Sequence, residues 1–388
     1  MMYDPETLDA VRQQVERATN FEFYESRLAD ADVDPSAIDS WDDFRDLPFT
    51  TTEALEDDFE ADPPTGSLYD EAAMVTFSPM GEGLAPVFDT RADIQHQASV
   101  NADIFERAGI EPGDRVVNTF GYQLFGTGYV IHRALEALGA EVFPLGPGDS
   151  EQAVDIITEY DVDALIGNPS FALKIGDAGG QVDTFVGAGE PFTSVPGRRT
   201  AVKDALDASR ALDYFGTRHI MPIAAETVTE DGLHVADDYA IVEVVDPDSG
   251  EILPEGERGE IVVTHVKKEG IPLIRYRTGD LAELEQRDGE VVLPEGVIGR
   301  TDERLKIKGV KIYPESIETV LAAFDGLTGE YRIEVEQAGS TDHLTVICEG
   351  TADTDALANE LGERLLISPD AVELSEELDP DGIVDNRY

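Results

Sequence analysis

Short apolar segments alternate with amphipathic segments from about residue 92 to residue 216, and this alternation limits the possible folds more than any other feature of the chain. The amphipathic segments, at 92–109, 129–139 and 152–161, have the periodicity of helices. The apolar segments have the composition of buried strands: DRVVNTF, AEVFPLG, DALIGNP, VDTFVGAGEP and SRALDYFG. Strands that alternate with helices of this length predict a parallel sheet flanked by helices.

The regions before and after this alternation have other patterns. Residues 4–29 are predicted to form one amphipathic helix. SWDDFRDLPFTTTEAL (40–55) predicts a short helix, a proline turn and a second helix with a threonine cap. After residue 233 the sequence is rich in strand-forming residues, until a polar joint, GRTD (299–302), precedes a stretch with the pattern helix, strand, strand, helix. We therefore predict two domains, 1–300 and 301–388, the second small and of α+β type.

The chain is strongly acidic. Its 388 residues carry a net charge of −54, with 82 Asp and Glu residues against 28 Lys and Arg. Such a charge destabilises a compact state by self-repulsion, but the Debye length falls to about 3 Å in roughly 1 M salt. The acidic residues are dispersed within an intact apolar periodicity, unlike those of a disordered acidic tail. Because lysine is also scarce, with seven in the chain, the composition predicts a halophilic protein from a salt-loaded cell.

The same composition excludes several functions. Nucleic acid and anionic membranes need a basic protein face, so neither is predicted as a partner. No apolar run reaches membrane-spanning length, and the acidic start, MMYDPETLDAVRQQ, lacks the pattern of a signal peptide. Cys348 is the one cysteine, so neither an intrachain disulfide nor a cysteine-based zinc site can form. We predict a cytoplasmic protein.

The most specific motifs lie between residues 276 and 320, where YRTGDL is followed by IGRTDERLKIKGVKIYPESIETVL. LPFTTTEAL, GYQLFGTGY, LGAEVFPLGPGDSEQ and GAGEP precede them in a matching order. On these motifs the sequence resembles the adenylate-forming (acyl-CoA synthetase-like) superfamily, and specifically its phenylacetate-CoA ligase group, over most of the chain. The resemblance implies an α/β fold. A large N-terminal domain would have parallel sheets flanked by helices and a β-rich subdomain, and a small mobile α+β domain would follow.

The resemblance also implies a reaction in two steps. The carboxylate of an acid attacks the α-phosphate of ATP, which gives an acyl adenylate and pyrophosphate. The small domain then rotates, and coenzyme A displaces AMP to form a thioester. The implied cofactors are ATP or AMP, Mg²⁺ and coenzyme A, and the implied partner is a small carboxylic acid. A homodimer, or a complex with an active paralogue, stays open.

The family's functional residues can be carried over to positions whose motifs match. Asp280 of TGD would hold the ribose hydroxyls, because a carboxylate can accept two hydroxyl protons, and Arg300 would reach the nucleotide. Asp302 would be the hinge residue, with Lys306 and Gly309 on the loop that swings towards the thiol. The other implied residues are Ser78 at the phosphates, Gly187, Ala188, Gly189, Glu190 and Pro191 along the adenine, Phe215 and Gly216 beside it, Tyr122, Phe125 and Gly126 in the acyl pocket, and Glu226 as a substitute metal ligand.

Three segments depart from the family pattern, and all belong to the adenylation step. FSPMGEGLAP (77–86) keeps Ser78 but lacks the other hydroxyls and the lysine of the family's phosphate loop. FGTRH (215–219) has His219 where the family has a Mg²⁺-binding glutamate, and that ion prefers oxygen ligands. No lysine follows Lys311, so the family's C-terminal lysine, which bridges the carboxylate and the α-phosphate, is missing.

These departures leave the activity open. The predicted function is an AMP-forming acyl- or aryl-CoA ligase with weakened adenylation. One alternative is a non-catalytic or half-reaction-only homologue that binds nucleotide or acyl-CoA, and another is a nucleotidyltransferase that acts on a deazaflavin coenzyme. Five of the seven lysines lie between residues 267 and 311. They form either a solvated positive face or a surface for an anionic ligand.

Overall fold

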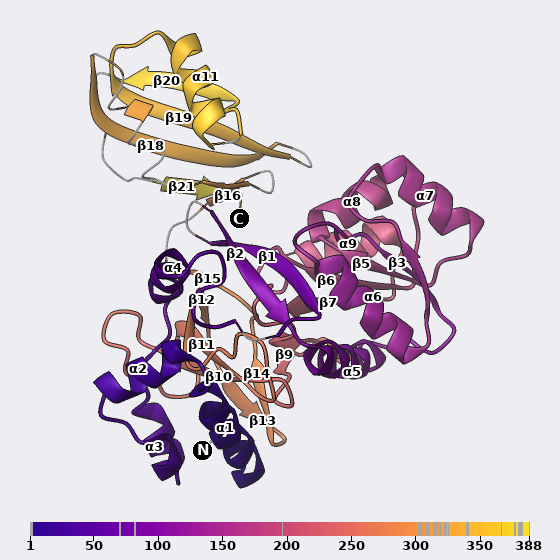
Figure 1. Cartoon of the computed structure of the whole chain (residues 1–388). Coiled ribbons are helices and arrows are strands. Elements are labelled where there is room, and N and C mark those ends of the chain that lie inside the picture. Colours follow the sequence, from indigo (N-terminus) through magenta and orange to yellow (C-terminus); the bar gives the residue numbers. More distant parts are fainter. Residues whose placement is uncertain are drawn as a thin grey trace. The chain divides into compact units, whose positions relative to one another are not determined.

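The computed structural model divides the chain into two compact units, Met1–Thr301 and Asp302–Tyr388, each with its own hydrophobic core (Figure 1). The structure describes residues 3–69, 71–80, 83–195, 197–301, 305–307, 310–312, 317, 320–321, 324, 326–338, 341–365, 367–375, 378 and 383–387. Within these ranges, every helix is too short or too polar to span a bilayer.

The larger unit contains a nine-stranded sheet in the order β13-β14-β9-β8-β7-β6-β5-β3-β4. The last five strands in this order are parallel: β7 (Arg210–Phe215), β6 (Thr184–Ala188), β5 (Ala164–Gly167), β3 (Arg115–Asn118) and β4 (Glu141–Pro144). The others continue the sheet with antiparallel pairings: β8 (Ala224–Ala225), β9 (Leu233–Val235), β14 (Glu290–Leu293) and β13 (Glu285–Arg287). The predicted parallel sheet is confirmed, and it forms part of a larger mixed sheet.

Helices cover both faces of the parallel strands (Figure 1). Successive side chains of a strand point to opposite faces, so Val116 packs in a core with α5 and α6, whereas Val117 packs in a second core with α7, α8 and α9. The bounds are α5 (Arg91–Arg107), α6 (Thr127–Leu138), α7 (Ser150–Glu159), α8 (Pro169–Asp177) and α9 (Arg198–Leu206). The flanking helices predicted from the alternation are confirmed, and α8 and α9 are additional to them.

A second, four-stranded antiparallel sheet has the order β10-β11-β12-β15. Its strands are β10 (Ala240–Val245), β11 (Gly259–His265), β12 (Tyr276–Ala282) and β15 (Gly299–Arg300). It shares one hydrophobic core with the N-terminal helices α1 (Pro5–Ala18), α2 (Glu22–Asp30), α3 (Trp41–Arg45) and α4 (Thr52–Ala61), and with the hairpin of β1 (Met74–Met80) and β2 (Gly83–Asp89). A 3-10 turn, Pro35–Ala37, lies between α2 and α3 in the chain. The helices α3 and α4 are those predicted from residues 40–55.

The single helix predicted over residues 4–29 is wrong, because two helices occupy this range. α1 ends at Ala18 and α2 begins at Glu22, while Phe21 between them has an extended backbone and is buried. The Asn20 side chain donates to a carbonyl of the last turn of α1, an arrangement that competes with helix continuation. With the break, Phe21 is buried in the same core cluster as Val15 and Ala18.

The smaller unit contains a four-stranded sheet in the order β20-β19-β18-β21. β18 (Leu327–Ala338) and β19 (Thr341–Gly350) are antiparallel, and β20 (Ala371–Ser375) and β21 (Ile383–Asn386) add to them in parallel. The helix α11 (Thr354–Leu365) follows β19, and β16 (Leu305–Ile307) pairs with β17 (Val310–Ile312) as a separate ribbon. The predicted strand, strand and second helix are confirmed, whereas the predicted first helix, at 314–324, lies largely outside the described residues.

Candidate active site

Several predicted site residues lie where the parallel strands of the larger unit end. Tyr122 follows β3, Gly189 follows β6, and Phe215 is the last residue of β7. Because β3, β5, β6 and β7 are parallel and adjacent, these residues lie at the same edge of the sheet. In open α/β sheets, ligands bind in the crevice outside the carboxyl ends of the strands. The structure therefore brings the predicted adenine and acyl segments to one edge.

The turn Gly187–Pro191 after β6 is fixed by its own backbone and by α8. Gly189 has a φ of +79°, a conformation that favours glycine. Glu190 accepts hydrogen bonds from the backbone N–H of Ser170, at 2.9 Å, and from its hydroxyl, at 2.6 Å. Since Glu190 holds the start of α8, the turn would contact an adenine mainly through its backbone.

The segment GYQLFG has one anchored aromatic residue and one exposed one. The Asn118 side chain donates to the Tyr122 hydroxyl at 2.9 Å, and Nδ1 of His132 lies 3.1 Å from the same oxygen. Burial raises the pKa of Tyr122 to about 12. Phe125 is 49% exposed, and Gly126, with a φ of +69°, precedes α6. The segment thus presents an uncharged aromatic surface beside the carboxyl end of β3.

Most of the predicted phosphate loop, FSPMGEGLAP, is strand. Ser78 is paired with Ala85 in the β1–β2 hairpin. Phe77 donates its backbone N–H to the carbonyl of Leu124, in the GYQLFG segment, at 3.0 Å. The hairpin is therefore attached to the predicted acyl segment, and the phosphate contact of Ser78 stays a prediction.

Asp280 and Arg300, both predicted to contact the nucleotide, lie opposite each other on β12 and β15. The Arg300 guanidinium donates to the Asp280 carboxylate at 2.5 Å. Gly279 has a φ of +75°, and a Cβ there would lie 2.8 Å from the Arg300 guanidinium. Glycine at this position therefore permits the ion pair, which keeps the carboxylate oriented.

A tight turn between β7 and β8 brings the two sheets of the larger unit together. Thr217 and Ile220 exchange backbone hydrogen bonds of 2.8 and 3.1 Å, so Arg218 and His219 occupy the tip of the turn. The His219 ring lies 6.4 Å from the ring of Tyr276, on the strand β12 that also carries the predicted ribose ligand. His219 therefore links the predicted adenine side of the site to the predicted ribose side.

The sequence does not predict a buried charge network that joins this turn to the hairpin. Arg218 pairs with one oxygen of Asp89 at 2.5 Å, and Lys268 pairs with the other, also at 2.5 Å. Lys268 lies 3.2 Å from Asp93, and all four residues are buried. The sequence signal for this network was Lys268 itself, because lysine is scarce in this chain, which has seven. Lys268 fits neither a solvated face nor a ligand surface, because its ammonium group is occupied by carboxylates.

Comparisons with known proteins place the chain in a family. A model described as the AMP-binding enzyme C-terminal domain matches residues 309–373. The phenylacetate-coenzyme A ligase of Pseudomonas putida is 31% identical, covering 93% of this chain and 86% of its own length. The ligase of the same name from Thermus thermophilus is 32% identical, covering 97% and 90%. This chain belongs to the phenylacetate-coenzyme A ligase family.

A solved structure of another CoA ligase has the same fold. The crystal structure of 2-hydroxyisobutyryl-CoA ligase, in complex with 2-HIB-AMP and CoA, matches 99% of this chain and 90% of its own, with a TM-score of 0.85 and 25% identity. The predicted adenylate-forming fold and ligase family are thus confirmed. These ligases give no support to the two alternatives, a non-catalytic homologue and a deazaflavin nucleotidyltransferase.

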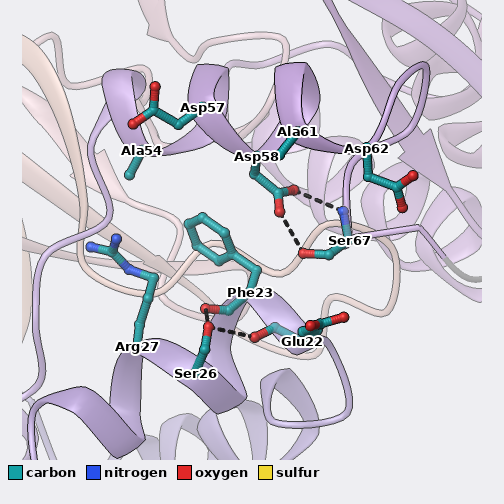
Figure 2. A pocket seen from close by; sticks show the side chains of 10 residues that line it. All are labelled: Glu22, Phe23, Ser26, Arg27, Ala54, Asp57, Asp58, Ala61, Asp62 and Ser67. Atoms are coloured by element: carbon teal, nitrogen blue, oxygen red, sulfur yellow. Dashed lines mark hydrogen bonds between the residues drawn. The ribbon is translucent and has the colours of Figure 1, made fainter.

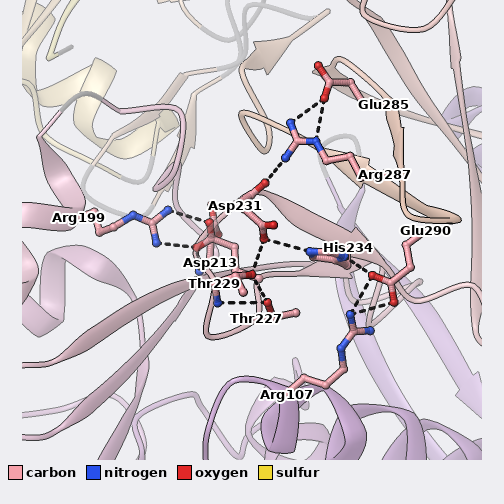
Figure 3. A network of polar contacts seen from close by, with 11 residues as sticks. Arg107, Arg199, Asp213, Thr227, Thr229, Asp231, His234, Glu285, Arg287 and Glu290 are labelled. Atoms are coloured by element: carbon pink, nitrogen blue, oxygen red, sulfur yellow. Dashed lines mark hydrogen bonds and ion pairs between the residues drawn. The ribbon is translucent and has the colours of Figure 1, made fainter.

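Within this phenylacetate-coenzyme A ligase family member, Glu226 is not placed as a metal ligand would be. Its side chain is fully buried and accepts from Arg199 at 2.7 and 2.8 Å. The Asp213 backbone N–H also donates to it, at 2.8 Å, and Arg199 and Asp213 belong to a larger polar network (Figure 3). No group of three or more His, Cys, Asp or Glu in the described part of the chain could hold a metal ion. These residues do not fit a protein-borne Mg²⁺ site.

Three predicted residues of the smaller unit cannot be placed. Asp302 and Gly309 lie outside the described residues, and of Lys306 only the backbone, in β16, is described. The hinge and thiol-loop roles that the resemblance implies for them stay predictions.

A cavity of about 420 Å³ between α2 and α4 lies apart from these segments (Figure 2). Four of its lining residues are acidic, and Arg27 is the one cation among them. Asp58 accepts from the backbone and hydroxyl of Ser67, at 2.9 and 2.5 Å. None of the predicted site residues lines this cavity, so it is not part of the candidate active site.

Proposed function

We propose that this protein joins a carboxylic acid to coenzyme A through an acyl adenylate. In the first step a carboxylate oxygen attacks the α-phosphorus of ATP, and pyrophosphate leaves with the electrons of the broken bond. In the second step the coenzyme A sulfur attacks the acyl carbon, AMP leaves, and the thiol proton passes to solvent. Both steps conserve atoms and charge without an oxidant or a reductant.

The observation that carries this proposal is the convergence of the predicted adenine and acyl segments at one edge of the sheet. The adenine would lie between the Gly187–Pro191 turn and Phe215, and the acyl group against Tyr122 and Phe125. Asp280, oriented by its ion pair, would accept hydrogen bonds from the ribose hydroxyls. Placed in this way, the carboxylate of the acid and the α-phosphate would be held side by side, which lowers the entropic cost of the reaction.

The acid is proposed to carry an apolar acyl or aryl group. The GYQLFG segment offers aromatic rings and no charge, and the nearby hairpin exposes Leu84 in addition. Similar ligases are named for phenylacetate and for 2-hydroxyisobutyrate, so one aromatic and one small branched acid are the first to test. An acid with a second charged group would pay a desolvation cost at this surface.

Adenylation is proposed to be the slower half-reaction. Lys311 is the last lysine of the sequence, and the hairpin at the predicted phosphate position is apolar in composition. Removal of one group that stabilises developing charge costs about 10²–10³ in rate, although such losses are not additive. Mg²⁺ is proposed to be needed only as a partner of the ATP phosphates, because no protein ligand set for it is described.

A cytoplasmic location in a salt-loaded cell is part of the same proposal. The single cysteine, Cys348, is buried, and burial raises its thiol pKa to about 11. A thiol with so little thiolate at neutral pH is poorly reactive, so the chain gives no sign of dependence on an oxidising compartment.

Two parallel assays test the proposed function. The first supplies acid, ATP and coenzyme A in molar salt and measures AMP, pyrophosphate and acyl-CoA across a panel of acids. The second supplies a preformed acyl adenylate and coenzyme A. We expect thioester from both assays, with the second faster. Absence of thioester in both, from protein shown to be folded, would refute the proposal, and equal rates would refute slow adenylation.

A further inference from the structure

One guanidinium joins three segments of the candidate site. Arg218, at the tip of the turn after β7, donates from Nε to the Thr76 hydroxyl of β1 at 2.7 Å. From Nη2 it donates to Asp89, the last residue of β2, at 2.5 Å. It therefore ties both strands of the hairpin to the carboxyl end of the parallel sheet.

Charges within this network are balanced and shielded from solvent. Arg218 and Lys268 face Asp89 and Asp93, and each of the four residues is at most 8% exposed. Burial alone would raise the pKa of Asp89, but Lys268 and Arg218 outweigh it and lower that pKa to about 2. Asp89 therefore stays ionised near neutral pH.

The two cations hold different parts of the hairpin. Lys268 contacts Asp89, Asp93 and the Phe88 carbonyl, which all lie at the junction of β2 and α5. Of these two cations, Arg218 is the one with a recorded contact to β1, at Thr76. Removal of that contact should loosen β1 while the junction stays fixed.

Thr76 is also close to the predicted acyl and phosphate positions. It lies two residues before Ser78 on the same face of β1. A Cβ placed on Gly126, at the end of the GYQLFG segment, would lie 2.4 Å from the Thr76 methyl group. Thr76 therefore packs directly against that segment, so a movement of β1 would be felt by both the hairpin and the acyl surface.

We propose that Arg218 is a positioning residue for ATP. It acts through its hydrogen bond to Thr76, which holds β1 in place. This inference rests on the proposed function, which places the triphosphate at the hairpin. With the hydroxyls and lysine of the family's loop missing, the donors left are Ser78 and backbone N–H groups. Such donors stabilise charge effectively only when they are held in place before the ligand arrives. Because AMP has no β- or γ-phosphate, its affinity should not depend on the contact between Arg218 and Thr76.

The test uses Thr76→Val, which removes the hydroxyl at nearly constant volume and keeps all four charges. Loss of one hydrogen bond to a charged donor corresponds to about a tenfold change or more. We expect about tenfold faster amide hydrogen exchange in residues 74–80 and about a tenfold higher KM for ATP. AMP affinity should be unchanged, because AMP occupies neither the β- and γ-phosphate positions nor the acyl surface.

Two further variants separate positioning from general destabilisation. Thr90→Val removes the hydrogen bond from Thr90 to Glu269, at 2.7 Å, and the cap that the Thr90 hydroxyl provides for the Asp93 N–H, at 3.1 Å. Both contacts lie at the start of α5, away from β1. This variant should lower stability without changing the ratio of ATP to AMP affinity. Arg218→Lys keeps the charge but lacks the fork that reaches Thr76 and Asp89 together, and should resemble Thr76→Val.

The outcomes distinguish the two proposals. Equal losses of ATP and AMP affinity in Thr76→Val, or the same losses in Thr90→Val, would overturn the positioning role. If the folded wild-type protein forms thioester in neither assay, the proposed function fails. In that case hydrogen exchange still tests whether Arg218 holds β1 at Thr76. Unchanged exchange of residues 74–80 in Thr76→Val would overturn that role.

Discussion

Replacement of Asp280 by alanine is expected to weaken AMP binding strongly. The carboxylate is 10% exposed and is oriented by Arg300. Each hydrogen bond from a ribose hydroxyl to it should contribute about 1.5–3 kcal/mol. Loss of one such bond lowers affinity about 10-fold to 150-fold, and loss of both would lower it further. The ion pair itself should add little to stability, because Arg300 is 36% exposed and salt screens it.

Titration calorimetry of AMP and ATP, in molar salt, measures this effect. Asp280→Asn keeps the shape of the side chain and should lie between wild type and Asp280→Ala, since neutral hydrogen bonds are weaker. Glu283→Ala is the matched control, because Glu283 is an acidic residue paired with Arg258 at 2.7 Å just after β12, outside the predicted site. Unchanged AMP affinity in a folded Asp280→Ala variant would remove Asp280 from the nucleotide site.

Three further predictions concern the frame around the site. Burial raises the pKa of Asp213 to about 6, so the folded state binds the proton of this carboxyl group more tightly than the unfolded state does. The free energy of unfolding should therefore fall by about 3 kcal/mol as the pH rises from about 4 to about 6. Asp213→Asn should remove that fall in chemical denaturation, and an unchanged pH profile would contradict it. Glu226→Gln should destabilise the protein by about 3 kcal/mol without changing Mg²⁺ dependence; altered Mg²⁺ affinity would restore Glu226 as a ligand. Limited proteolysis should cut near residues 300–305 and leave a large N-terminal fragment, whereas cleavage elsewhere with this stretch protected would count against a mobile small domain.

Sequence periodicity predicted the helices and strands whose apolar pattern follows from burial of one or both of their faces. β3, β5, β6 and β7 were recognisable because strands covered on both faces are continuous apolar runs. The break between α1 and α2 was not, because helical periodicity continues across it and the decisive event is the burial of Phe21. β20 and β21 were also missed, since their pairing partners are distant in sequence.

The motif resemblance names residues by their place along the chain, whereas the partners of each side chain become visible only in the structure. Asp280 and Arg300 were both assigned to the nucleotide, and the structure shows them directly opposed. Glu226 was assigned to a metal because it is a carboxylate near the right place, but its partner Arg199 is not visible from spacing. Asp89 and Lys268 were missed for the same reason, because in an acidic sequence a buried charge looks like a surface charge.

The excess of carboxylates should also govern how ATP reaches the site. Two cations of the described part of the site are already paired, Arg300 with Asp280 and Arg218 with Asp89. The net charge of −54 should therefore repel a polyanion. Because the Debye length shrinks from about 10 Å at 0.1 M to about 3 Å at 1 M salt, ATP association should become faster as KCl is raised, the reverse of the usual effect on anion binding. Stopped-flow binding of a fluorescent ATP analogue would measure this, with adenosine as the uncharged control and thermal midpoints at each salt to correct for folding. A rate that falls with salt while the protein stays folded would mean that the local field at the site is positive, and would refute the reasoning from net charge.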